Sequence, residues 1–345
     1  MISIVIPSHN NLRHLKNAYI SIKKHAPEAE IILLDDASTD ETWEWISLLN
    51  DDKILRYRVP TRSGHTILYD IGISMATNEI VGIFHADMIM APGYVGNVLK
   101  HLTRGKVVCG TRIEPPLHPE GAEKIVRNFG MDFDDLNIPA FEEFALSAQT
   151  EYVGKTSRGM FAPWVIYKED FQAIGGHDPG FAPFPYEDSD IFQRWLLAGY
   201  ELIQSRDAFV YHLTCRGHRW NEQVGVNDNY FIKAEEKARK YYLKKWGSWI
   251  KNDENQHPII IPVYKKKLKI NNFKPEFEIL YDWFNDGADI EVTLDGSTFT
   301  QQDFNYIVNL NEIIKDSGEV GEFQLGNLHI KINALTEYQD SLIKL

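Results

Sequence analysis

Short apolar runs alternate with segments of helical periodicity over the first 110 residues of the chain. This alternation predicts a mostly parallel sheet whose strands are joined by crossover helices. The expected strands are Ile2–Ile6, Glu30–Leu34, Ile54–Val59 and Ile80–Phe84, and the expected helices are Leu12–Lys24, a segment from the capping residues Ser38–Glu41 to about Leu49, and residues 66–76. We therefore expect an α/β, Rossmann-like fold with helices flanking the sheet.

The pattern changes after the fourth expected strand. Residues 113–150 are rich in proline and acidic residues without clear periodicity, so we expect a mobile loop over a site. Ordered structure is expected again over residues 158–213, with helices at 167–174 and 188–199 and a strand at 207–212.

The last third of the chain mixes both periodicities. Residues 229–246 have the pattern of a basic amphipathic helix rich in tyrosine. Beyond about residue 255, strand-like runs at Ile259–Val263 and Glu322–Ile332 accompany a helical pattern over Gln302–Lys315. This mixture predicts a smaller α+β domain at the C-terminal end.

Charge supports a division of the chain. The net charge is −13, which argues against nonspecific nucleic-acid binding by the whole surface. Residues 233–274, the basic belt, nevertheless carry 12 Lys and Arg against 4 Asp and Glu. We place a catalytic domain over residues 1–250 and a smaller domain over 255–345, which would serve acceptor binding or oligomerisation.

Cysteine usage and hydropathy bound the location. Cys109 and Cys215 cannot form a disulfide framework and fit a reducing compartment. The N-terminus runs directly into a strand-like stretch, without a charged leader and apolar segment. No apolar run approaches the roughly 20 residues that a membrane-spanning helix needs. We expect a soluble, cytoplasmic protein, with peripheral attachment to a membrane surface left open.

Polar clusters follow the expected strands at their carboxyl ends, where open α/β sheets bind ligands. Together with later segments they form five motifs: Ser3–Asn10, Leu34–Asp40, the turns Arg62-Ser63-Gly64 and Asp70-Ile71-Gly72, His85-Ala86-Asp87, and Ile174–Asp178 followed by Glu187–Asp190, Arg194 and Ala198-Gly199-Tyr200. In this order and spacing, the motifs resemble those of the family-2 glycosyltransferases, inverting enzymes of the GT-A fold. The resemblance covers about residues 1–250.

The resemblance implies a donor site for a nucleoside-diphosphate sugar, with a UDP-sugar favoured. Pro7, Ser8 and Asp36 would line the nucleoside pocket, with Asp36 accepting a hydrogen bond from the base. Tyr69 stands where the family often has a phosphate-binding arginine, and Arg62 would replace that charge from the other turn. In isolation, Asp36 could instead belong to a polar turn.

The resemblance also implies a metal site. His85-Ala86-Asp87 occupies the place of the family's Asp-x-Asp motif, so Asp87 is the expected ligand, and His212 is placed where related enzymes have a further metal or phosphate contact. His85 stands where an acid is usual, and it would ligate the metal or contact the donor. Imidazole suits Mn2+ better than Mg2+, so Mn2+ is the expected cofactor and Mg2+ the alternative.

Asp188 is the expected general base, and Glu187 would orient the acceptor or the base. Acidic residues at a helix start also have a simpler explanation as caps that complement the helix dipole. A single sugar would pass to an acceptor hydroxyl of a glycan, a lipid-linked acceptor or a nucleic acid, most simply in glycan or polysaccharide synthesis.

Rival functions remain open from the sequence. A non-catalytic nucleotide-sugar-binding module is supported by His85 in the acid position, and a glycosyltransferase acting on modified DNA bases would use the basic belt against phosphates. The belt also fits a solvated helix face or a surface for anionic lipid. A nucleotidyltransferase is disfavoured because no Gly-rich basic loop follows the first strand.

Overall fold

The computed structural model describes residues 1–214, 229–246 and 249–259, together with the strands 220–221, 226–227, 267–273, 289–294, 322–325 and 328–332. The chain separates into two compact units. One consists of Met1–Ala238 with Asn252–Pro258, and the other of Arg239–Lys251 with Ile259–Leu345. The domain boundary expected between residues 250 and 255 stays a prediction.

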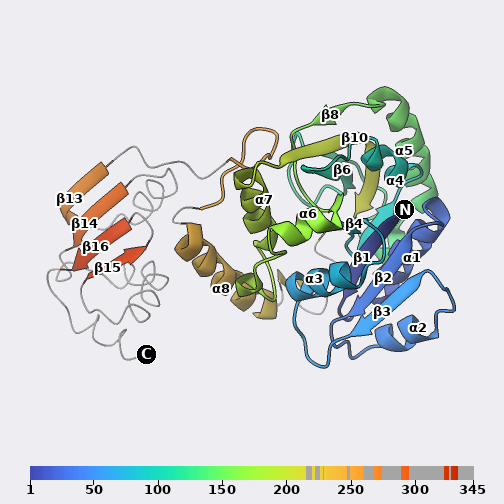
Figure 1. Cartoon of the computed structure of the whole chain (residues 1–345), viewed down its shortest axis with the longest axis horizontal. Helices are drawn as coiled ribbons and strands as arrows, with labels where there is room; N and C mark the ends of the chain where they lie inside the picture. The colour runs from blue at the N-terminus through green and yellow to red at the C-terminus, as the bar shows by residue number, and fades with distance from the viewer. Residues whose placement is uncertain are drawn as a thin grey trace. The chain divides into compact units, whose positions relative to one another are not determined.

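A ten-stranded sheet is the centre of the first unit, in the order β3-β2-β1-β4-β9-β6-β10-β5, with β7 paired to β6 and β8 to β10 (Figure 1). Strands β1, β2, β3, β4, β6 and β10 are parallel, whereas β5 and β9 are antiparallel to their neighbours. The strands are β1 (Ile2–Ser8), β2 (Glu30–Asp35), β3 (Ile54–Arg58), β4 (Ile80–Ile83), β5 (Met88–Met90), β6 (Lys106–Glu114), β7 (Lys124–Val126), β8 (Thr156–Ser157), β9 (Trp164–Tyr167) and β10 (Glu201–His212).

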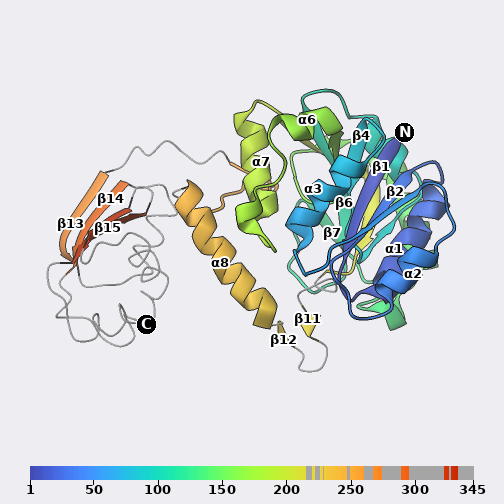
Figure 2. The same cartoon turned by 60° about the horizontal axis from the view of Figure 1, so that its bottom comes forward.

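Helices cover both faces of this sheet, and Figure 2 shows α1 and α3 on opposite sides of the strands. Ile4 and Ile6 pack in one buried cluster with α1, while Val5 between them packs in another with α3. This alternation is what a strand buried on both faces requires. The helices are α1 (Leu12–His25), α2 (Thr42–Leu48), α3 (His65–Met75), α4 (Tyr94–Leu99), α5 (Ile138–Tyr152), α6 (Lys168–Ala173), α7 (Glu187–Leu197) and α8 (Asn229–Trp246).

The predicted α/β fold class is confirmed, and the expected elements of the first 110 residues are all present. Helix α2 begins later than its capping residues suggested, at Thr42, whose N–H donates to the Asp40 carboxylate at 3.0 Å. The strand expected at 207–212 is the second half of the longer β10. The basic helix expected over 229–246 is α8.

The prediction of a mobile loop over residues 113–150 is wrong. This segment contains β7, the 3-10 turn Phe133–Asp135 and most of the 15-residue helix α5. Asn137 caps α5 by accepting the N–H of Ala140. Phe141, Ala145 and Ala148 form its buried face, in one cluster with Phe209 and Tyr211 of β10. Helical spacing of three apolar residues therefore outweighs the acidic composition of the segment.

In the second unit, a four-stranded sheet has the order β13-β14-β16-β15. Its strands are β13 (Lys267–Phe273), β14 (Asp289–Leu294), β15 (Glu322–Leu325) and β16 (Leu328–Ile332), so the strand-like run Glu322–Ile332 is an antiparallel pair. The expected helix Gln302–Lys315 lies outside the described residues, as does the run Ile259–Val263 apart from Ile259. The side chains of Lys265, Lys266 and Lys267, on which a nucleic-acid role would depend, lie outside them too.

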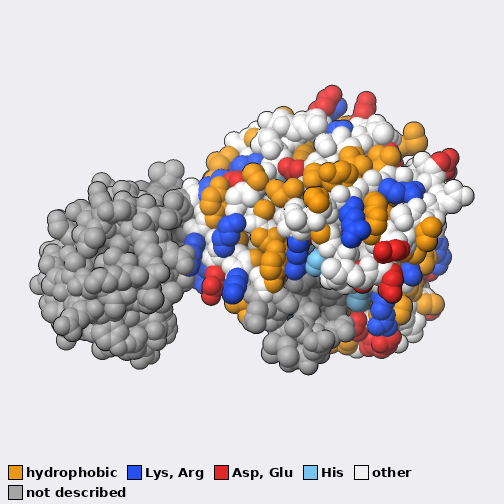
Figure 3. All heavy atoms as spheres, turned by 90° about the horizontal axis from the view of Figure 1, so that it is seen from below, with side chains coloured by type: hydrophobic (Ala, Val, Ile, Leu, Met, Phe, Trp, Pro, Cys, Tyr) orange, Lys and Arg blue, Asp and Glu red, His pale blue; other side chains and the backbone are white. Residues whose placement is uncertain are grey.

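The surface of the first unit gives little indication of a binding face. On the side shown in Figure 3, positive, negative and apolar side chains are interspersed. Large apolar side chains such as Leu48 and Val153 are exposed at scattered positions. Among the described residues, none of the helices has the length and apolar character needed to cross a bilayer. We therefore expect the binding or catalytic residues of the first unit to lie in a cavity.

Candidate functional site

A cavity of about 580 Å³ opens at the carboxyl edge of the large sheet. Residues at or after the carboxyl ends of five parallel strands line it: Ser8 at the end of β1, Asp36 after β2, Asp87 after β4, Glu114 at the end of β6 and Thr214 after β10. Parallel strands place their carboxyl ends along one edge, so side chains that are distant in sequence meet there. The predicted donor and metal residues that line this cavity are Pro7, Ser8, Asp36, Arg62, His85, Ala86, Asp87 and His212.

Asp36 is buried, and two backbone N–H groups hold its carboxylate. Its two carboxylate oxygens accept the N–H groups of Ser63 at 2.6 Å and Gly64 at 2.9 Å. Gly64 has φ of +85°, and a Cβ there would collide with Pro183, so this turn requires glycine. The guanidinium of Arg62 lies over the ring of Tyr230, 3.9 Å from its centroid. Each Asp36 oxygen keeps a further lone pair with which it can accept a ligand donor.

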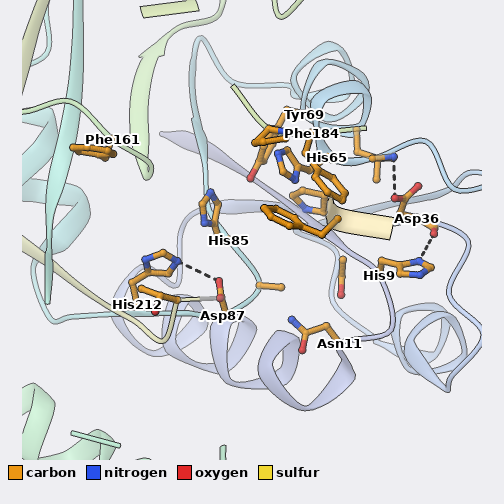
Figure 4. Close-up of a pocket in the computed structure, with 18 of the residues that line it drawn as sticks. His9, Asn11, Asp36, His65, Tyr69, His85, Asp87, Phe161, Phe184 and His212 are labelled. Carbon is orange, nitrogen blue, oxygen red and sulfur yellow. Dashed lines mark hydrogen bonds and ion pairs between the residues drawn. The ribbon is translucent and has the colours of Figure 1, made fainter. Parts of the chain in front are cut away.

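A second group of polar residues, the His–Asp–His cluster, consists of His85, Asp87 and His212. One nitrogen or oxygen of each lies within 4.8 Å of the others, and Nε2 of His212 is 3.6 Å from Oδ1 of Asp87 (Figure 4). Two imidazoles and a carboxylate are ligands that suit Mn2+ better than Mg2+. The donor set of this chain therefore fits a divalent transition-metal ion.

Neighbouring groups shift the pKa values of the two imidazoles of the cluster in opposite directions. Burial and the neighbouring His212 lower the pKa of His85 to about 3, so its imidazole is neutral and can donate a lone pair. Burial alone would lower the pKa of His212, but Asp87 and Glu114 outweigh it and raise that pKa to about 9. Nδ1 of His212 donates to Glu114 at 3.0 Å, which turns Nε2 toward Asp87. Such an outer carboxylate orients an imidazole ligand and increases its basicity.

Glu187 and Asp188 begin α7, and neither is among the described residues that line the cavity. Glu187 pairs with His65, a lining residue, at 2.7 Å. Burial would raise the pKa of Glu187, but the charge of His65 outweighs it and lowers that pKa, whereas burial and the charge of Glu187 raise the pKa of Asp188 to about 6. Asp188 also accepts the N–H of the next residue, Ser189, at 2.6 Å within the first turn of α7. Neighbouring carboxylates with separated pKa values are typical of acid–base sites.

Other lining residues escaped the sequence analysis. Arg112 and Glu114 lie at the carboxyl end of β6. The sequence pattern that could have identified them is the one used for the earlier strands, in which polar residues follow an apolar run. This pattern was missed because a loop was expected from residue 113 onward. Further additions include Asn11, His65, Glu123, Lys124 and Thr214.

Several buried polar atoms of the lining residues lack a hydrogen-bond partner in the described part of the chain. They are Ser8 Oγ, Asn11 Nδ2, Arg62 Nε, Arg112 Nε, Glu123 Oε2 and Thr214 Oγ1. Each unmade hydrogen bond of a buried group costs roughly 1–3 kcal/mol. Because these six atoms belong to residues that line one cavity, a polar ligand bound there is one way to satisfy them.

Comparison with known proteins gives two family matches. Residues 3–144 match the model for glycosyl transferase family 2, and residues 150–216 match the model described as the N-terminal domain of galactosyltransferase. Together the two segments contain every lining residue of the cavity except Phe231 and Glu235, and they also contain Glu187 and Asp188.

Individual relatives are distant. The uncharacterized protein y4gI of Sinorhizobium fredii is 23% identical over 231 residues, which are 63% of this chain and only 25% of that protein. Among solved structures, GalNAc-T7 with UDP, GalNAc and Mn2+ has a TM-score of 0.48 and 16% identity over 71% of this chain and 50% of its own. The mannosyltransferase PcManGT of Pyrobaculum calidifontis, in complex with GDP-Man and Mn2+, has a TM-score of 0.45 and 16% identity, over 71% of this chain and 62% of its own. S. aureus TarS has a TM-score of 0.45 and 12% identity, over 70% of this chain and 39% of its own.

Proposed function

We propose that this chain is a nucleotide-sugar glycosyltransferase, with a donor, a metal and a catalytic base that the cavity supports. The proposed reaction moves one hexose from a nucleoside-diphosphate sugar, a UDP-sugar first, to an acceptor hydroxyl with inversion at the anomeric carbon. One observation supports it most: a single cavity holds Asp36 on one side and the His–Asp–His cluster on another (Figure 4).

The donor would bind along this cavity. Asp36, fixed by the amides of Ser63 and Gly64, accepts an N–H of the base. The unpartnered atoms of Ser8 and Asn11 lie in residues of the same lining and bind the ribose or its phosphate. Arg62, held against Tyr230, supplies a positive charge toward the diphosphate.

His85, Asp87 and His212 would hold the metal ion, Mn2+ rather than Mg2+ because of the two imidazoles. A bound divalent ion supplies positive charge that stabilises a departing diphosphate. Glu114 keeps His212 in the orientation that presents Nε2 to Asp87.

Asp188 would take the proton of the acceptor hydroxyl as its oxygen attacks the anomeric carbon. The new glycosidic C–O bond forms while the bond to the phosphate oxygen breaks, and the electron pair leaves with the nucleoside diphosphate. Glu187, kept ionised by His65, raises the proton affinity of Asp188 and orients it. A base whose pKa lies closer to the working pH is a better proton acceptor in such a step.

A screen of UDP- and GDP-sugars by thermal shift, with and without Mn2+, tests the donor and the metal. A ligand bound by the folded form raises the melting temperature. The enzyme should also release nucleoside diphosphate from the sugar nucleotide that binds. Asp87→Asn should lower this release on the order of 10²- to 10³-fold, whereas Glu142→Gln, a change to a carboxylate paired with Lys24 on α1, should not. Binding without product release would identify a non-catalytic module instead. No stabilisation by any sugar nucleotide would reject the proposal.

A further inference from the structure

One end of the cavity is not used by the proposed donor and metal residues. It is formed by Arg112 on β6, Glu123 just before β7, Phe161 before β9 and Thr214 after β10. We refer to these four residues as the β6–β7 subsite. Its side chains are enclosed: Glu123 and Thr214 are 7% and 4% exposed, and the guanidinium of Arg112 packs on the Phe161 ring 4.1 Å from its centroid.

The subsite adjoins the His–Asp–His cluster through one ion-pair chain. Glu114 binds Nδ1 of His212 at 3.0 Å, and the same carboxylate pairs with Arg112 at 3.2 Å. Arg112 in turn lies 3.8 Å from Glu123. A group held in the subsite would therefore lie next to the expected metal ligands.

The charges of this region are balanced, which decides the class of ligand. Arg112 and Lys124 face Glu114 and Glu123, and the pairs are within 3.0 to 3.8 Å of one another. A phosphate would bring negative charge against Glu123, and the two described Lys and Arg side chains of this region, Arg112 and Lys124, already have acidic partners. Like charges without a counter-ion in an enclosed site are unfavourable. The subsite is thus poorly suited to a lipid diphosphate or a nucleic-acid backbone.

The unpartnered atoms match neutral hydroxyl groups. Arg112 Nε can only donate, Glu123 Oε2 can only accept, and the Thr214 hydroxyl can do both. A pair of adjacent sugar hydroxyls offers both functions, with one accepting from the guanidinium and one donating to the carboxylate. The ring of Phe161 lines the same space and offers an apolar surface to the C–H face of a pyranose.

The position of the Glu123 carboxylate is fixed by its surroundings. Its carbonyl accepts from Nε2 of Gln204 at 2.6 Å, and β7, which begins at the next residue, pairs with β6. Gly121 leaves room for the carboxylate, because a Cβ at position 121 would collide with Oε2 of Glu123. Loop geometry thus fixes the carboxylate of this lining residue.

We propose that the β6–β7 subsite binds the uncharged hydroxyl groups of a pyranose, with Glu123 and Arg112 selecting the sugar. This inference rests on the proposed function for its place in the reaction. The pyranose is either the hexose of the donor or the terminal residue of a glycan acceptor, and a charged acceptor group does not occupy the subsite.

Two variants and a matched control test the subsite. Glu123→Gln removes the charged acceptor, and Gly121→Ala displaces it without removing the charge. Glu120→Gln makes the same chemical change at an exposed position of the same loop. All three should bind UDP with Mn2+ within about twofold of the wild type, since the subsite does not contact the nucleotide. A hydrogen bond to a charged group corresponds to about a tenfold change in affinity or more.

The two sources of the sugar give different results. If the donor hexose occupies the subsite, Glu123→Gln and Gly121→Ala weaken binding of UDP-glucose, UDP-galactose or their N-acetyl analogues about tenfold. If the acceptor does, donor affinity is unchanged and the KM for a methyl glycoside acceptor rises about tenfold. The proposal is overturned if both variants match Glu120→Gln in both assays, or if affinity for UDP falls as much as affinity for the UDP-sugar.

Failure of the proposed function is recognised separately. If the wild type binds no sugar nucleotide, saturation-transfer NMR with methyl glycosides alone decides the matter. Glycoside binding that is lost in Glu123→Gln and kept in Glu120→Gln supports the subsite even then. The absence of glycoside binding to the wild type overturns it.

Discussion

Asp36 and Asp87 are two buried carboxylates that follow β2 and β4, the two neighbours of β1, yet their surroundings differ. Asp36 is held by two backbone N–H groups. Asp87 faces His212, and this partner and His85 lower its pKa well below the usual range despite burial. Backbone amides fix a carboxylate without a cation, whereas imidazoles are partners that can be shared with a metal ion.

In the proposed function, this difference divides the cavity into an end that is preformed and an end that would respond to metal. Nucleotide recognition by Asp36 should not depend on Mn2+, because its donors carry no titratable charge. The His–Asp–His cluster should gain order and affinity for diphosphate when a cation binds. Variants at each end, and at the base beside them, can separate these contributions.

The largest loss of turnover is expected for Asp188→Asn. Asp188 belongs to neither end of the cavity. Loss of a general base lowers kcat about 10²- to 10⁴-fold, while affinities for UDP and Mn2+ stay at the wild-type level. The pKa of Asp188 is raised to about 6, and the base works only when ionised. The wild-type rate should therefore rise with pH through about 6 and level off above it. Steady-state kinetics from pH 5 to 8 measure this profile.

Two results would assign Asp188 to helix capping instead of catalysis. One is a variant with normal kcat and a lowered melting temperature, because the carboxylate also accepts the N–H of Ser189. The other is a wild-type profile without a limb near pH 6. Ser189→Ala, which removes only the hydroxyl contact to Asp188, is the control and should keep the profile.

The second-largest effect is expected for Asp87→Asn. Loss of an electrostatic contact to the departing group typically lowers turnover on the order of 10²- to 10³-fold. The stabilisation of the protein by Mn2+ should disappear, and metal-free binding of UDP should remain. Thermal shift with and without Mn2+, together with product release, measures both. Retention of the Mn2+ effect in Asp87→Asn would mean that the cluster does not bind the metal.

Comparison of Asp36 and Asp87 with Glu123 shows which parts of the site could be predicted. The first two follow near-continuous apolar strands, and a local pattern is enough to place a residue at a strand's carboxyl end. Glu123 reaches the cavity because β7 folds back beside β6. That pairing depends on tertiary contacts, which cannot be predicted from the periodicity of apolar residues.

The fold shows the same limit. Strands of the first half, such as β1 and β2, are buried on both faces and read directly as apolar runs. Helix α5 escaped because only one stripe of it is buried, among residues whose acidic composition suggested a loop. The sequence did contain its start, Asn137 followed by Pro139, as a capping signal. This capping signal predicts the helix more reliably than the acidic composition of the segment predicts a loop.

A smaller effect is expected for Glu114→Gln. The amide keeps a hydrogen bond from His212 but removes the negative charge that makes this imidazole more basic. Loss of such an outer partner lowers metal affinity roughly 10- to 100-fold. Titration of free Mn2+ by electron paramagnetic resonance measures it without reference to turnover, and Glu142→Gln serves as control. Unchanged Mn2+ affinity would show that Glu114 acts only as the counter-ion of Arg112 and Lys124.

The smallest effect, and the sharpest test of the comparison, is expected for Asp36→Asn. Asparagine has one acceptor oxygen, so it cannot bind both Ser63 N–H and Gly64 N–H, and its NH2 group opposes one of them. Affinity for UDP should fall about tenfold, with and without Mn2+ to the same extent, as isothermal titration would measure. Mn2+ affinity should not change. If the loss appeared only with Mn2+ present, the two ends would be coupled, because a preformed carboxylate held by backbone amides has no reason to sense the metal.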